Sequence, residues 1–155
     1  MKTTPNNNWR IVSEIDLIYK TKVKSSDRPH ISSSRAAYTL LKDCWDPDKI
    51  EFLEQFKVLL LNQSNKVLGI YEASSGGITG TVVDIRLLFA AALKAGATAL
   101  IAAHNHPSGS ITASEADKHI TRKIAQAGML LDIKLLDHLI VTPENYYSFS
   151  DEGAL

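Results

Sequence analysis

The stretch from residue 98 to 120, TALIAAHNHPSGSITASEADKHI, constrains the fold more than any other part of the chain. It begins with TALIAA, an apolar run of strand length, and two histidines follow directly at positions 104 and 106. Pro107 and a short Gly/Ser turn then end the strand, and Ser114 opens a helical pattern. The stretch therefore predicts a strand, a turn and a helix, with polar side chains concentrated at the strand end.

The rest of the chain predicts further strands and helices in mixed order. We expect strands at 9–20, at 132–141 and on both sides of the polar turn NQSN within 54–74, and helices within 31–45, 84–96 and 114–128. An aromatic tail at 145–155 should pack on the sheet. Because regular β-α-β alternation is absent, we expect a single α/β domain over residues 9–155, a mixed sheet sandwiched by three helices, after a disordered polar lead-in at 1–8.

Apolar residues at helical spacing predict which helix faces are buried. The first helix should bury Ala37, Leu40, Leu41 and Cys44, and the third should bury Ala116, Ile120, Ile124 and Ala127. Cys44 is then a small core residue rather than a nucleophile.

Charge and cysteine content limit the function classes. The 155 residues carry 17 Lys+Arg and 17 Asp+Glu, so the net charge is zero and nothing indicates a general attraction to nucleic acid or to membranes. A single cysteine excludes a disulfide framework and is typical of a reducing compartment. Without an apolar segment resembling a signal peptide or a membrane span, we expect a cytoplasmic protein.

The two histidines have the spacing of metal ligands. Side chains at i and i+2 of a strand point the same way from positions about 6.6 Å apart, so His104 and His106 can converge on one ion while Asn105 points away. Ser114 and Asp117 share a face in the first turn of the next helix, which follows the strand end. Asp117 as third ligand would leave a fourth position for water, the pattern of a catalytic zinc site.

Each half of this pattern also has a simpler explanation. Chance produces a His-x-His pair in about one such chain in six, and Ser114 with an acid three residues later is an ordinary N-cap. A cap can, however, also orient a ligand. The combination of His-x-His-Pro at a strand end, a Gly turn and Ser-x-x-Asp favours the metal site.

HNHPSG followed by Ser114-x-x-Asp117 resembles the metal-binding signature of the JAB/MPN (JAMM) domain, in its bacterial RadC-like branch. LLDHLIV at 135–141 and LNQSNKVL at 61–68 resemble the same branch, so the resemblance extends from about the first helix onward. It implies a JAB-type, cytidine deaminase-like α-β-α fold with one Zn²⁺. His104, His106 and Asp117 match the metal ligands, and Ser114 matches the hydroxyl that assists the transition state.

The resemblance also implies a glutamate on an earlier strand, near the attacking water. Glu72, in YEASSGG, is our candidate for this general base, and Glu51 and Glu54 are its competitors. The implied reaction is amide or isopeptide hydrolysis in a peptide or protein substrate, with the Ser114 hydroxyl donating to the oxyanion, a contact typically worth about 3 kcal/mol.

Two other function classes stay open from the sequence. In a nucleic-acid-processing factor the metal would act on a phosphodiester, and in a binding module the fold would persist without catalysis. The neutral charge argues against the first, and the intact ligand set argues against the second. Longer relatives carry an N-terminal helix-hairpin-helix region associated with DNA, and nothing here matches it, so the resemblance does not carry a DNA-repair role.

The remaining histidines have plainer explanations. His138, inside an apolar strand, is either a partner that orients a metal ligand or a satisfied structural residue, and we expect the second. His30 and His119 should be a loop residue and a solvent-facing helix residue.

Overall fold

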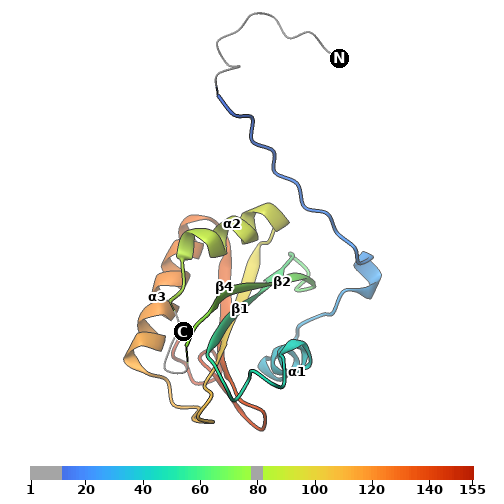
Figure 1. The fold of residues 1–155 in the computed structure, drawn as a ribbon. Coiled ribbons are helices and arrows are strands. Elements are labelled where there is room, and N and C mark those ends of the chain that lie inside the picture. Colours follow the sequence, from blue (N-terminus) through green and yellow to red (C-terminus); the bar gives the residue numbers. More distant parts are fainter. Residues whose placement is uncertain (1–11, 78–81) are drawn as a thin grey trace, which may run out of the picture.

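The computed structural model describes residues 12–77 and 82–155, so the predicted lead-in at 1–8 lies outside the described residues. Figure 1 shows a twisted sheet with helices on both sides. The strands are β1 (Gln55–Leu61), β2 (Val67–Ser75), β3 (Ala99–Asn105), β4 (Lys134–Val141) and β5 (Tyr146–Ser148). The helices are α1 (Ser34–Cys44), α2 (Ile85–Ala95), α3 (Glu115–Leu130) and the short 3₁₀ helix η2 (Ser25–Asp27).

The five strands form one mixed sheet in the order β2-β1-β3-β4-β5. β1 pairs antiparallel with both β2 and β3, β3 pairs parallel with β4, and β4 pairs antiparallel with β5. The parallel pair is joined through α3, as a crossover connection requires. The predicted hairpin and the mixed sheet are therefore confirmed, and part of the aromatic tail is itself a strand.

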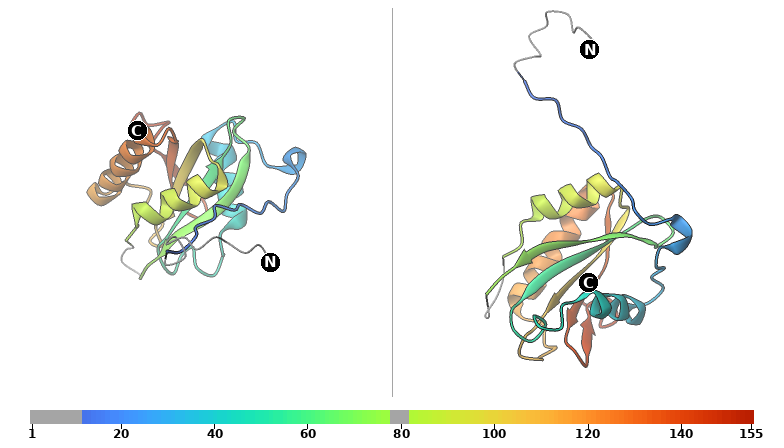
Figure 2. Two further views of the ribbon diagram at one scale, coloured as in Figure 1. Left: turned by 90° about the horizontal axis from the view of Figure 1, so that it is seen from above. Right: turned by 45° about the vertical axis from the view of Figure 1, so that its right-hand side comes forward.

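Two buried clusters cover the two faces of the sheet, which makes the domain a three-layer sandwich (Figure 2). On one face α1, through residues such as Leu41, packs over Leu59, Ile101, Leu139 and Val141. On the other face α2 and α3, through residues such as Leu88 and Ile124, pack over Val58, Leu100 and Leu135. All seven residues of β3 are buried because this central strand is covered on both faces.

Local sequence signals explain where the helices begin and end. The Ser33 and Asp84 side chains accept hydrogen bonds from backbone N–H groups in the first turns of α1 and α2. Gly96 ends α2 in the left-handed conformation, with φ of 69°. Ser114 and Asp117 form a reciprocal capping box at the start of α3.

Two predictions about individual segments are wrong, and a third is right in part. Residues 12–20 form no strand in the described part of the predicted segment. Cys44 is exposed, because α1 ends there and Trp45 is the next buried side chain. The apolar stripe predicted for α3 is right in part: Ile124 is buried and Ile120 and Ala127 pack partly buried against the same core, but Ala116 is exposed. The fully buried residues of α3 are Asp117, Thr121, Ile124 and Gly128.

Gly128 fixes the approach of α3 to the start of β4. A Cβ atom at this position would lie 2.2 Å from the backbone carbonyl oxygen of Ile133. We expect Gly128→Ala to lower the free energy of unfolding by about 1–3 kcal/mol, because the backbone must move to relieve the clash. Gly69→Ala in β2 is the control, since a Cβ there meets nothing within 4 Å. Urea titrations that give both variants the same stability would contradict this packing.

Within residues 12–77 and 82–155, no helix has both the length and the apolar character needed to cross a membrane.

Candidate metal centre

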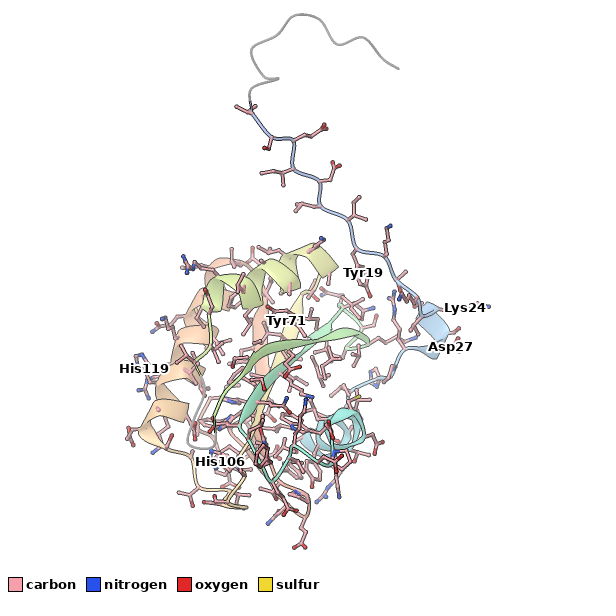
Figure 3. The ribbon with its side chains drawn as sticks, in the orientation of Figure 1. Tyr19, Lys24, Asp27, Tyr71, His106 and His119 are labelled. Atoms are coloured by element: carbon pink, nitrogen blue, oxygen red, sulfur yellow. The ribbon has the colours of Figure 1, made fainter. Side chains whose placement is uncertain are left out.

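His104 and His106 bring two imidazoles to the end of β3, where Figure 3 shows His106 at the lower end of the sheet. The His104 side chain is 1% exposed and that of His106 is 16% exposed. Asp117 reaches the same point from the first turn of α3. Among the described residues, these three are the group of His, Cys, Asp or Glu side chains that can hold a metal ion.

The donor atoms have the mutual spacing of ligands around one cation. His104 Nε2 lies 3.0 Å from His106 Nε2 and 3.1 Å from Asp117 Oδ1, and His106 Nε2 lies 3.2 Å from Asp117 Oδ2. Metal–ligand bonds of about 2.0 Å at tetrahedral angles place ligand atoms about 3.3 Å apart. The three side chains therefore fit a tetrahedral site with one open position.

The capping box orients the Asp117 carboxylate. Asp117 Oδ2 accepts a hydrogen bond from the Ser114 backbone N–H at 2.9 Å, and Ser114 Oγ accepts one from the Asp117 N–H at 3.0 Å. Burial by itself would raise the pKa of Asp117, but hydrogen bonds and charge from His104 and His106 hold it well below its usual range. The Asp117 carboxylate thus takes part in the helix cap and is also the predicted metal ligand, and in its ionised form it can bind a cation.

The hydrogen bond of His106 defines which of its ring nitrogens carries a proton. Nδ1 lies 2.8 Å from the Ser110 carbonyl oxygen, which can only accept, so Nδ1 is protonated. In the neutral ring, Nε2 then has a free lone pair facing the site. The hydrogen bond with Asp117 is the main cause that raises the pKa of His106, with burial acting against it.

Two residues support His104 on the side away from Asp117: His138, for which the sequence favoured a structural role over a ligand-orienting one, and Thr121, which the sequence did not single out. His104 Nδ1 lies 2.8 Å from His138 Nε2, and His138 Nδ1 lies 2.6 Å from Thr121 Oγ1. Burial lowers the pKa of His138 well below its usual value. The contact with His104 favours the alternative that the sequence left open for His138, a partner that orients a metal ligand. Thr121 carried a readable signal, because position i+4 shares the helix face of Asp117.

Glu72 lies on the opposite face of the sheet from this cluster. It pairs with Lys57, whose ammonium lies 4.5 Å from the centroid of the Trp45 ring on the α1 side. Its Oε1 accepts a hydrogen bond from Gln55 Nε2 at 2.8 Å. The structure thus brings together His104, His106, Ser114 and Asp117, but does not bring Glu72 to them.

Glu54 lies just before β1, on the face that carries the cluster. It is two positions from Phe56, whose ring stacks on that of His104, and side chains at i and i+2 share a face. Burial raises the pKa of Glu54, while the charges of His104 and His106 lower it in part and that of Asp117 raises it further. Its carboxyl group therefore lies within the electrostatic field of all three candidate ligands.

Asn105 fixes the backbone around Glu54 from the other side of the sheet. Its Nδ2 donates 2.8 Å hydrogen bonds to the carbonyl oxygens of Ile50 and Leu53, and its Oδ1 accepts from the Gln55 N–H at 2.7 Å. The side chain points away from the histidines, as predicted. Of the three consecutive residues 104–106, the two histidines therefore provide candidate ligands on one face of the sheet, and Asn105 holds the backbone around Glu54 by hydrogen bonds on the other face.

The comparisons with known proteins show the family to which the domain belongs. The family model described as RadC-like JAB domain matches residues 31–154. A UPF0758 protein of Flavobacterium johnsoniae is 53% identical over 124 residues, which cover 79% of this chain and 52% of that protein. UPF0758 protein YfjY of Escherichia coli is 39% identical over 130 residues, which cover 81% of each chain.

Some relatives are considerably longer than this chain. The UPF0758 protein of Porphyromonas gingivalis, 42% identical over 130 residues, has 56% of its length covered, and the Flavobacterium protein has about half covered. The similarity therefore concerns the domain that this chain shares with these longer relatives. A match to the family model over 124 consecutive positions shows that this chain belongs to the RadC-like JAB domain family.

Proposed function

We propose that this protein is a zinc-dependent hydrolase that cleaves an amide or isopeptide bond in a peptide or protein substrate. The observation that carries the proposal is the spacing of 3.0 to 3.2 Å among His104 Nε2, His106 Nε2 and the Asp117 carboxylate oxygens. Two imidazoles and one carboxylate with an open corner are typical of catalytic rather than structural zinc sites. When bound there, zinc would supply a Lewis acid and an acidified water.

Glu54 is the general base that we propose in place of Glu72. Burial raises its pKa, which brings a carboxylate closer to the pH at which it exchanges protons efficiently. Its carboxylate would take the proton of the attacking water and later deliver it to the leaving amine. Glu72, which the sequence favoured, is separated from the cluster by the sheet itself.

Ser114 is proposed to stabilise the oxyanion. Its Oγ accepts from the Asp117 N–H at 3.0 Å, which leaves the hydroxyl hydrogen able to donate. A second hydrogen bond, from the Ser114 backbone N–H to Asp117 Oδ2 at 2.9 Å, holds this donor and the candidate metal ligand in one fixed geometry. Such preorganised donors contribute most where charge develops in the transition state.

The proposal is tested by incubating the zinc-loaded protein with three probes. These are quenched-fluorescent linear peptides, peptides branched through a lysine isopeptide bond, and labelled duplex and single-stranded DNA. We expect cleavage of a linear or branched peptide, its loss on chelation and its return with added zinc. Cleavage of DNA alone would support a nucleic-acid-processing factor, and stoichiometric zinc without cleavage of any probe would indicate a binding module. Both outcomes contradict the proposal.

A further inference from the structure

We propose that Thr121 and His138 are positioning residues that keep His104 in the one tautomer able to bind a metal through Nε2. The inference rests on the metal site of the proposed function and adds the device that prepares one of its ligands. Three consecutive hydrogen bonds, from the Asp117 carbonyl through Thr121 and His138 to His104, define which ring nitrogens carry protons.

The chain starts at a group whose role is fixed by its chemistry. Thr121 Oγ1 lies 2.6 Å from the backbone carbonyl oxygen of Asp117, and a carbonyl can only accept, so the hydroxyl donates its single hydrogen there. The contact to His138 Nδ1, also 2.6 Å, must then be one in which Thr121 Oγ1 accepts. His138 Nδ1 is therefore the protonated nitrogen of that ring.

The next step fixes His104. His138 is fully buried and packs between Phe56 and Phe149, an environment that favours the neutral ring. A neutral His138 with its proton on Nδ1 has an acceptor at Nε2, so His104 Nδ1 donates across the 2.8 Å contact. In the neutral His104 ring, the lone pair then lies on Nε2, which faces His106 and Asp117.

The two histidine ligands reach the same tautomer in different ways. The backbone carbonyl of Ser110 binds His106 Nδ1 directly, in the turn that follows β3. The partner of His104 Nδ1 is instead a side chain on the neighbouring strand β4, that of His138. The Nε2 atom of a histidine can either accept or donate a hydrogen bond, so His138 by itself does not define the tautomer of His104. Thr121 removes this ambiguity, because it accepts a hydrogen bond from His138 Nδ1 and so leaves His138 Nε2 as an acceptor. Since the Thr121 hydroxyl also donates to the backbone of Asp117, the three hydrogen bonds connect β3, β4 and α3.

The matched variants are Thr121→Val and Thr121→Ser. Valine keeps the shape but neither accepts from His138 nor binds Asp117, whereas serine keeps both hydrogen bonds. We expect Thr121→Val to weaken zinc binding by about 10- to 100-fold, the usual effect of losing a group that supports a ligand, and Thr121→Ser to stay near the wild type. Zinc affinity is measured by competition with a chromophoric chelator. Equal affinity in wild type and Thr121→Val would overturn the inference.

A second measurement on the unmodified protein needs neither variant nor substrate. Long-range ¹H–¹⁵N NMR spectra of the imidazoles distinguish a protonated Nδ1 from a protonated Nε2. His138 is expected as the Nδ1–H tautomer both without metal and with zinc, and an Nε2–H tautomer in either state would overturn the inference. Because both measurements are independent of hydrolysis, a failure of the proposed activity would leave this result standing, and the reverse also holds.

Discussion

Replacing Glu54 by Gln is expected to lower kcat by about 10²- to 10⁴-fold while zinc remains bound, because the amide cannot accept the proton of the attacking water. Glu54 contributes no atom to the cluster of donor atoms, so its loss should not change metal content. The measurement is kcat for the best peptide probe, with zinc determined on the same samples.

Glu72→Gln is the matched control, since it makes the same chemical change on the other face of the sheet. The Glu72 side chain is exposed and its one carboxylate hydrogen bond is to Gln55 Nε2, a contact that a Gln can keep through its amide oxygen. We expect activity near that of the wild type. If Glu72→Gln abolishes turnover and Glu54→Gln does not, the assignment drawn from the sequence is right and ours is wrong.

Replacing both His104 and His106 by Ala is expected to remove zinc from the purified protein altogether, because Asp117 would be the one remaining ligand of the cluster. The control is the double variant His30→Ala with His119→Ala. Both of these residues are exposed, as the sequence predicted for His119, and Figure 3 shows His119 on the outer side of α3. This pair removes two histidines as well, so it corrects for adventitious binding of zinc.

His104 is buried, so its replacement could disturb folding as well as the metal. His106→Ala alone provides a second variant, because its side chain lies at the rim of the site. We expect this variant to keep a cooperative unfolding transition and to lose most of its zinc. Zinc content equal to that of the wild type in both His106→Ala and the double variant would remove the metal centre, and the hydrolase with it.

Much of the local structure was readable from the sequence because it depends on short-range physics. The caps at Ser33, Asp84 and Ser114 and the stop at Gly96 all act within one helical turn, so residue type and spacing are enough to predict them. The predicted strand at 9–20 failed over its described part. Apolar alternation creates a strand only where a neighbouring strand supplies backbone hydrogen bonds. Residues 12–20 join no strand ladder, and the hydrogen bond from this segment to β2 comes from the Tyr19 side-chain hydroxyl to the Leu68 carbonyl oxygen.

The buried face of α3 includes polar residues that the spacing of apolar residues does not predict. Apolar spacing favoured Ala116 and Ile120, yet Asp117 and Thr121 are the buried residues in that half of the helix. Burying polar side chains costs free energy unless they find partners, and here the partners come from the end of β3 and from β4. Periodicity of hydrophobic residues therefore cannot predict a face whose polar groups are satisfied by tertiary contacts.

The sequence by itself determined the candidate ligand set, because the positions of His104, His106 and Asp117 relative to one another depend on one strand, one turn and one helix that are continuous in the chain. The tertiary structure alone decided which glutamate faces that set and what supports His104. Those contacts depend on the register between β1, β2 and β3 and on the adjacency of β3 and β4. A shift of register by one residue moves a side chain to the other face of a sheet, and the long-range pairing that sets the register is not encoded in any local pattern.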